Sequence, residues 1–86
     1  MRQHAPKVTL YSKPDCPLCL KAKRLLEKLQ PEFGFGIEEV DITRDEVLYE
    51  RYRWEIPVIT VGGKELLKGR IAEEPLREVL RSAFED

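Results

Sequence analysis

The sequence has almost no net charge, because 15 basic side chains face 16 acidic ones and the formal charge at pH 7 is −1. It also lacks a long basic stripe, which is the electrostatic feature that nucleic-acid binding requires. Uninterrupted apolar runs of about 18 residues, the length that a membrane helix needs, are missing as well. We therefore expect no nucleic-acid partner and no membrane attachment.

Cysteines are scarce, and the amino-terminal residues 1–7 lack the apolar run that follows the charges of a secretory signal. The two cysteines are Cys16 and Cys19, and a bridge between positions so close in sequence closes almost no loop. Such a bridge contributes little to folding. Both observations favour a reactive or metal-binding cysteine pair in a reducing compartment, and therefore a cytoplasmic protein.

The length of the chain limits it to one modest core, since a domain of 86 residues buries only about 60% of the surface of its unfolded chain. Apolar residues make up 42% of the sequence, which is sufficient for that core, and charged residues make up 36%. No repeat, low-complexity segment or linker divides the chain. We expect a single domain spanning residues 1–86.

The first predicted elements are a strand and a helix. Residues 8–11 are β-branched or aromatic and precede a turn at residues 12–15, which is the pattern of a short buried strand. From Pro17 to Gln30 apolar residues recur near helical spacing. Pro17 suits the first helical position, and Pro31 is expected to end the helix.

A second strand and a second helix are predicted next. Residues 37–42 alternate less cleanly, but their apolar positions support a strand. Thr43 to Glu46 has the pattern of a capping box, and the helix that it starts is expected to end near Arg53.

The last part of the chain predicts a hairpin and a closing helix. Strands at residues 57–61 and 65–67 flank a glycine pair that supplies the positive φ angles of a tight turn. Two glutamates and a proline at residues 73–75 suit the first turn of a helix. The element order is therefore β-α-β-α-β-β-α, which describes an α/β domain with a mixed sheet.

The helix that begins at Pro17 places Cys16 at its N-cap. A thiolate there faces unpaired backbone N–H groups and the positive end of the helix dipole, which favour the anion over the neutral thiol. Cys16 is therefore expected to be the more acidic thiol and the nucleophile. Cys19 lies one turn into the helix, where it is less open to solvent and is expected to resolve the mixed disulfide that Cys16 forms.

Two other interpretations of the cysteine pair stay open. A zinc site usually requires four ligands, and besides the two cysteines the sequence offers only the nitrogen of His4 as a further one. Two inert core thiols are the second alternative, although the helix start at Cys16 argues for exposure of that residue. We expect no metal to be bound by a single chain.

The stretch Tyr11-Ser12-Lys13-Pro14-Asp15-Cys16-Pro17-Leu18-Cys19, with Ile56-Pro57-Val58 downstream, resembles the glutaredoxins and glutaredoxin-like thioredoxin-fold proteins. The likeness spans nearly the whole chain and implies a thioredoxin fold, in which helices flank a mixed four-stranded sheet. The family motif is typically Cys-Pro-Tyr-Cys, so Leu18 takes the place of the tyrosine. Lys13 matches the lysine of the preceding turn, which implies a role in substrate binding.

The resemblance also implies that Pro57 is the cis-proline that opens the strand facing the active site. An Ile56–Pro57 cis bond would leave the Ile56 backbone free to pair with a bound peptide or glutathione. Base rates favour an ordinary trans proline at a strand start. The upstream Cys-x-x-Cys favours the functional interpretation.

The chain departs from the family after the hairpin, where glutathione-using members typically have Gly-Gly-x-Asp and residues 68–73 here read Lys-Gly-Arg-Ile-Ala-Glu. Gly69 would still permit a close backbone approach. Arg70 or Arg53 would pair with a carboxylate. Alternatively, both arginines are simply solvated charges on the protein surface. Trp54 fits a rim contact for a substrate protein or, more simply, packing under the loop.

The resemblance implies a dithiol thiol–disulfide oxidoreductase that reduces protein or glutathione mixed disulfides through Cys16 and Cys19. We expect no resident cofactor, glutathione as a co-substrate, a reductase or glutathione as the electron donor, and a monomer. One alternative is an iron–sulfur or metal-handling protein in which Cys16 of two chains holds a cluster. The other is a non-catalytic adaptor that binds a partner through the Pro57 surface.

Overall fold

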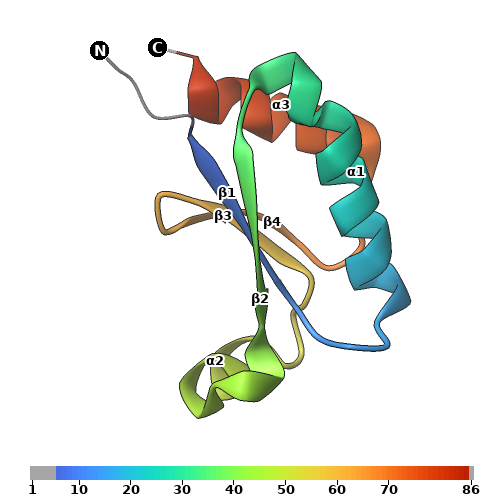
Figure 1. The fold of residues 1–86 in the computed structure, drawn as a ribbon, viewed down its shortest axis with the longest axis vertical. Helices are drawn as coiled ribbons and strands as arrows, with labels where there is room; N and C mark the ends of the chain where they lie inside the picture. The colour runs from blue at the N-terminus through green and yellow to red at the C-terminus, as the bar shows by residue number, and fades with distance from the viewer. Residues whose placement is uncertain (1–5, 86) are drawn as a thin grey trace.

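A computed structural model describes residues 6–85 as a four-stranded sheet flanked by helices (Figure 1). The elements confirm the predicted order, with one added 3-10 helix, η1. No helix in this part of the chain combines the length and the apolar character that membrane crossing requires. In chain order the elements are β1 (Lys7–Ser12), α1 (Pro17–Phe33), β2 (Gly36–Asp41), η1 (Ile42–Arg44), α2 (Glu46–Tyr52), β3 (Val58–Val61), β4 (Lys64–Lys68) and α3 (Glu73–Phe84).

The strand order across the sheet is β2-β1-β3-β4. β1 runs parallel to β2, whereas β3 runs antiparallel to both β1 and β4, so the sheet is mixed as predicted. The register puts Tyr11 opposite Val58. The end of β1 therefore lies beside the start of β3. The loop that follows β1 and carries Cys16 and the loop that precedes β3 and carries Pro57 thus lie at the same end of these two strands.

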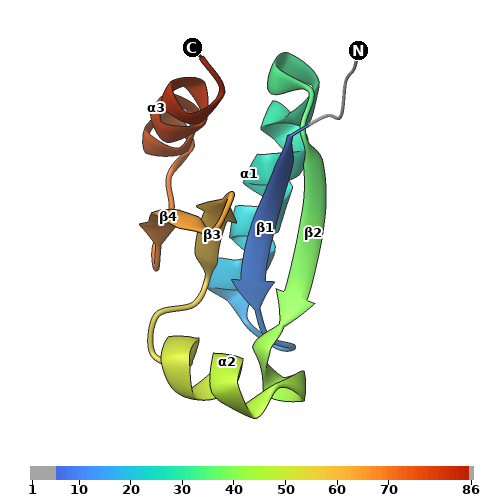
Figure 2. The same cartoon turned by 90° about the vertical axis from the view of Figure 1, so that its left-hand side faces the viewer.

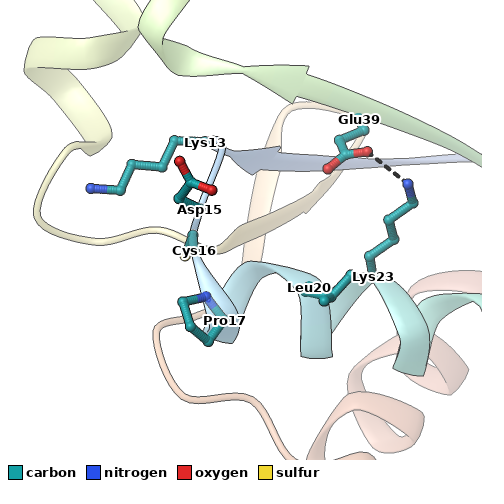
Figure 3. Close-up of a pocket in the computed structure, with 7 residues that line it drawn as sticks. All are labelled: Lys13, Asp15, Cys16, Pro17, Leu20, Lys23 and Glu39. Atoms are coloured by element: carbon teal, nitrogen blue, oxygen red, sulfur yellow. Dashed lines mark ion pairs between the residues drawn. The ribbon is translucent and has the colours of Figure 1, made fainter.

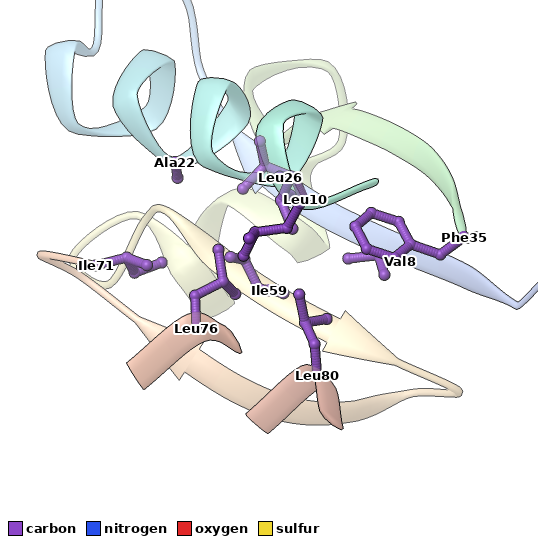
Figure 4. Close-up of a cluster of buried hydrophobic side chains, with 10 residues drawn as sticks. Val8, Leu10, Ala22, Leu26, Phe35, Ile59, Ile71, Leu76 and Leu80 are labelled. Atoms are coloured by element: carbon purple, nitrogen blue, oxygen red, sulfur yellow. The ribbon is translucent and has the colours of Figure 1, made fainter. Parts of the chain in front are cut away.

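The main core lies between one face of the sheet and the helices α1 and α3 (Figure 4). Val8 and Leu10 alternate onto this face of β1 and are fully buried, as is Leu26 of α1. This packing orients α1 on the sheet and so fixes the position of its first residues. The other buried members of the core are Ala22, Leu29, Phe35, Ile59, Ile71, Leu76 and Leu80.

A smaller core on the opposite face attaches α2 to the sheet. Tyr11 points to this side of β1 and stacks on Tyr52, with 4.7 Å between the ring centroids. Burial raises the pKa of the Tyr52 phenol. In both Figure 1 and Figure 2, α2 lies at the end of the molecule where α1 begins. The two cores therefore bring α2 and the β1–α1 loop to the same end of the fold.

The predicted end of the first helix was wrong, because α1 continues through Pro31 to Phe33. A proline in the last turn removes one backbone hydrogen bond but does not force the chain to leave the helix. Gly34 ends it instead, in the left-handed conformation with φ 77°, and its N–H donates to the Gln30 carbonyl at 2.8 Å.

The predicted capping box was also wrong, since Asp45 and not Thr43 caps α2. The Asp45 carboxylate accepts from the N–H groups of Val47 and Leu48 at 2.9 and 3.0 Å. Thr43 belongs to η1, where its hydroxyl and N–H both donate to Asp41 and hold the pKa of that carboxyl below its usual range. Asp41 therefore caps η1 and Asp45 caps α2, where the sequence predicted a single cap at Thr43.

Ion pairs join α1 to α3 on the exterior of the main core. Arg77 of α3 contacts Glu32 of α1 at 3.3 Å and Glu73 at 3.2 Å. Lys28 of α1 donates to Glu73 at 2.9 Å, and this bond, followed by the one from Arg77, holds the pKa of Glu73 below its usual range. Glu73 of α3 and Glu32 of α1 thus both link the two helices.

We expect the Glu73 ion pairs to stabilise the fold at neutral pH and to be lost in acid. Because the folded pKa of Glu73 is depressed, its contribution is complete above the unfolded value of about 4.3 and disappears as pH falls through the folded pKa. Urea unfolding midpoints measured from pH 7 to pH 3 should fall less steeply for Glu73→Gln than for the wild type. Parallel pH profiles for the two proteins would contradict this assignment.

Candidate active site

Cys16 occupies the N-cap of α1, as the sequence predicts. Its backbone is extended, with φ −119° and ψ 101°, and Pro17 takes the first helical position. The Cys16 Sγ atom accepts a hydrogen bond from the Cys19 N–H at 3.2 Å. A sulfur in this position replaces the oxygen of an ordinary Ser or Asp cap, and a negative charge on it would face the unpaired N–H groups of the first turn.

Cys16 and Cys19 form a disulfide, with their Cα atoms 5.2 Å apart. Cys16 is half-buried, whereas Cys19 is only 3% exposed. The two sulfurs therefore differ in access, and a reaction partner approaching from solvent would reach Cys16 first.

The residues before Cys16 form an exposed turn. Asp15 has φ 59°, a left-handed conformation that Asp adopts more readily than most residues. Lys13 and Asp15 are both exposed and both line the same pocket as Cys16. The turn thus brings the cation of Lys13 and the anion of Asp15 to the pocket beside Cys16.

A pocket of about 580 Å³ opens beside Cys16 (Figure 3). Its far wall is an ion pair between Lys23 and Glu39, 3.1 Å apart, and the buried Ser12 hydroxyl donates to Glu39 at 3.0 Å. The complete lining is Lys13, Asp15, Cys16, Pro17, Leu20, Lys23 and Glu39.

The Ile56–Pro57 peptide bond is cis, and the Pro57 side chain is fully buried. The expectation that the whole Ile56 backbone is free was wrong, because its N–H donates to the Tyr52 carbonyl at 3.1 Å. After α2 ends at Tyr52 the chain turns back, which brings the Ile56 N–H to the Tyr52 carbonyl. Among the described residues no backbone donor is bonded to the Ile56 carbonyl, so this group is the part left for pairing.

Gly69 lies next to Pro57, since its N–H donates to the Pro57 carbonyl at 2.8 Å. Arg70 follows it and is exposed. Arg53, the other candidate for binding a carboxylate, lies 3.6 Å from Glu50 and is therefore already paired. The pocket that joins Lys13 to Cys16 does not include Ile56, Pro57, Gly69 or Arg70, which precede β3 or follow β4 at the end where Val58 pairs with Lys68.

Metal ligands do not gather in the described part of the chain, which holds no group of three or more His, Cys, Asp or Glu side chains arranged for an ion. His4, which the zinc interpretation invoked, lies outside the described residues.

Residues 7–81 match the family model of the glutaredoxin-like domain (DUF836). The chain belongs to the glutaredoxin-like family. Together with the fold and the Cys16–Cys19 disulfide, this membership indicates a redox function, of the general thiol oxidoreductase kind.

Relatives of this glutaredoxin-like protein include a "Probable Thioredoxin" of Archaeoglobus fulgidus, which is 31% identical over 75 residues, covering 84% of this chain and 82% of the relative. A "Glutaredoxin-like protein YDR286C homolog" of Dictyostelium discoideum is 29% identical over 75 residues, covering 80% and 69% of the two chains.

Two solved structures share both sequence and fold with the glutaredoxin-like chain. Protein XcR50 of X. campestris has a TM-score of 0.77 at 29% identity and covers 87% of this chain and 96% of its own. Protein Ne2328 of Nitrosomonas europaea has a TM-score of 0.79 at 25% identity and covers 99% of both. NrdH-redoxin of Escherichia coli, at 24% identity and a TM-score of 0.60, shares the fold.

Sequence reasoning missed the Lys23–Glu39 wall of this glutaredoxin-like site. The register pairs Leu10 with Glu39, so Glu39 lies on the α1 side of β2 and reaches Lys23 of α1. The less regular alternation of residues 37–42 was the available signal, because a carboxylate on the helix-facing side of a strand needs a partner.

Proposed function

We propose that this protein is a dithiol thiol–disulfide oxidoreductase that reduces protein or glutathione mixed disulfides through Cys16-Pro17-Leu18-Cys19. The observation that carries the proposal is the unequal access of two bridged sulfurs at a helix N-terminus, Cys16 half-buried and Cys19 buried. This arrangement supports one sulfur meeting the substrate and the other closing the cycle.

In the proposed cycle the Cys16 thiolate attacks one sulfur of a substrate disulfide. A Cys16–substrate bond forms, the substrate S–S bond breaks, and the departing thiolate takes up a proton. Cys19 then loses its proton and attacks Cys16 Sγ, which forms the Cys16–Cys19 bond and releases the second substrate thiol. The substrate gains two electrons and two protons, and the cysteine pair loses them.

The oxidised pair must be reduced again by an external thiol. We propose a reductase or glutathione as the electron donor, and no resident cofactor, because thiol exchange requires none. The missing Gly-Gly-x-Asp makes glutathione the weaker candidate for tight binding. We further propose that the protein works as a monomer in the cytoplasm.

Substrate binding is assigned to residues on both sides of Cys16. On one side, Lys13 would attract an anionic group to the pocket. On the other, the Ile56 carbonyl would accept a hydrogen bond from a substrate backbone, with Pro57 and Gly69 holding it in position and Arg70 available to a carboxylate.

The proposal is tested by adding the protein to insulin with dithiothreitol, and in a second series with glutathione and glutathione reductase. We expect clear acceleration of insulin reduction over the reductant alone with dithiothreitol, and a smaller one with glutathione. A rate equal to that of the reductant alone in both series would refute the proposed activity.

A further inference from the structure

Glu39 of β2 ties together the two segments that border the Cys16 turn. One of its carboxylate oxygens accepts from the Ser12 hydroxyl at 3.0 Å, and the other lies 3.1 Å from Lys23 Nζ. Ser12 is the last residue of β1, just before the turn, and Lys23 belongs to α1, which follows it. Because Ser12 is only 3% exposed, its hydroxyl needs an acceptor, and this bond fixes the Glu39 carboxylate in place.

Lys23 lies on the same side of α1 as Cys16. It follows Cys16 by seven residues, about 10 Å along the helix axis, and both residues line the same pocket. Side chains of a helix lean toward its N-terminus, so a long and flexible lysine chain at this position is able to extend toward the cysteine. In Figure 3 it reaches across to Glu39 instead. The ion pair therefore determines where the Lys23 charge lies relative to Cys16.

Four charged side chains line the pocket beside Cys16, namely Lys13, Asp15, Lys23 and Glu39. A nearby cation stabilises a thiolate, and a nearby anion destabilises it. Lys13 and Asp15 carry opposite charges and belong to the turn itself, so their effect on Cys16 is the same whichever way Lys23 points. The charge whose position depends on a partner is that of Lys23.

We propose that Glu39 is a positioning residue that holds the Lys23 ammonium away from Cys16 and thereby keeps the Cys16 thiol less acidic than a free lysine would make it. A more acidic Cys16 would stabilise the reduced pair and make the bridge a stronger oxidant. The Ser12–Glu39–Lys23 contacts therefore favour the reducing direction. This inference rests on the proposed function, because it concerns the direction in which the same cysteine pair exchanges electrons.

The acidity of Cys16 is measured in a Cys19→Ser background, which leaves one thiol in the chain. The rate of iodoacetamide alkylation is followed by intact mass from pH 4 to pH 9 at about 0.1 M ionic strength. We expect Glu39→Gln to raise the acid dissociation constant of Cys16 at least fourfold, because it releases Lys23. The amide oxygen still accepts from the Ser12 hydroxyl, so the fold is kept while Lys23 loses its ionic partner.

The Lys23→Gln variant separates the release of Lys23 from the loss of a fixed anion. A fixed charge about 10 Å away in water changes an acid dissociation constant only about twofold. In the Lys23→Gln background, Glu39→Gln should therefore raise the constant no more than twofold. If Glu39→Gln has an equal or larger effect when Lys23 is absent, the carboxylate acts without restraining the lysine and the proposal is overturned.

Glu32→Gln is the matched control on the same helix. It removes the same charge and breaks another ion pair of α1, the one with Arg77 at 3.3 Å. Glu32 follows Cys16 by sixteen residues, about 24 Å along the helix axis, and charges are largely screened beyond about 10 Å at this ionic strength. We expect the acid dissociation constant of Cys16 to stay unchanged. A rise as large as that in Glu39→Gln would contradict a local role for Glu39.

The reducing direction is tested with the intact cysteine pair in glutathione buffers at pH 8. Two glutathione thiols reduce the bridge to two cysteine thiols and leave as glutathione disulfide, so the reduced fraction gives the equilibrium constant. We expect Glu39→Gln to shift this constant at least twofold toward the reduced pair. An unchanged constant, or a shift toward the bridge, would refute the proposed role.

The two proposals fail differently. If the wild type does not accelerate insulin reduction, the proposed function is refuted, while the alkylation rates still decide whether Glu39 restrains Lys23. If insulin is reduced but the effect of Glu39→Gln does not depend on Lys23, the role of Glu39 alone is refuted.

Discussion

The Cys16→Ser variant is expected to reduce insulin no faster than the reductant alone. Cys16 is the half-exposed sulfur at the helix N-cap, and a hydroxyl there neither ionises at neutral pH nor attacks a disulfide. Cys19 cannot replace it, because its side chain is only 3% exposed. The loss should be complete and is measured by the same insulin assay with equal protein concentrations.

The Cys19→Ser variant is the matched control for this loss. It keeps the attacking sulfur and should therefore form a mixed disulfide with the substrate that persists in the absence of reductant, visible by intact mass. The opposite pattern, with activity retained in Cys16→Ser and absent in Cys19→Ser, would reverse the assigned roles.

The Leu26→Ala variant is expected to lose about 2–5 kcal/mol of the free energy of unfolding. Leu26 is fully buried near the middle of α1, in the main core, where it projects toward Leu10 of the sheet (Figure 4). Its truncation removes apolar contacts and leaves a cavity beneath the helix that presents both cysteines. The measurement is a urea unfolding curve followed by far-UV circular dichroism.

Leu20→Ala provides the control on the same helix, since Leu20 is 49% exposed. We expect it to change the free energy of unfolding by about 0.5 kcal/mol or less. Equal unfolding midpoints for the two variants would show that the packing of α1 on the sheet does not stabilise the fold as described.

The order of elements could be predicted because it depends on local patterns. Apolar spacing and turn residues marked each helix and strand, and the hairpin between β3 and β4 followed from its glycine pair. The Cys16 N-cap was predictable for the same reason, since Pro17 fixes the helix start one residue later. The cis state of Pro57 followed from family resemblance alone.

What could not be predicted depends on contacts between distant residues or on competing local rules. Pro31 was expected to end α1, but the helix tolerates it three residues before the left-handed Gly34. The Lys23–Glu39 wall required the register of two parallel strands, which the sequence does not state. Trp54 is 85% exposed, so the expectation that it packs under the loop was wrong, and its exposure required knowledge of how the chain continues after α2 ends at Tyr52.

The central claim is tested most directly by equilibrating the purified protein with glutathione redox buffers at neutral pH. The Cys16–Cys19 bridge is followed by thiol alkylation and intact mass, and any glutathione adduct is located by peptide mapping. We predict a reversible two-electron transition between about −200 and −270 mV, with an adduct only on Cys16. A pair that does not respond to the buffers, or that is found holding metal, would contradict the oxidoreductase assignment.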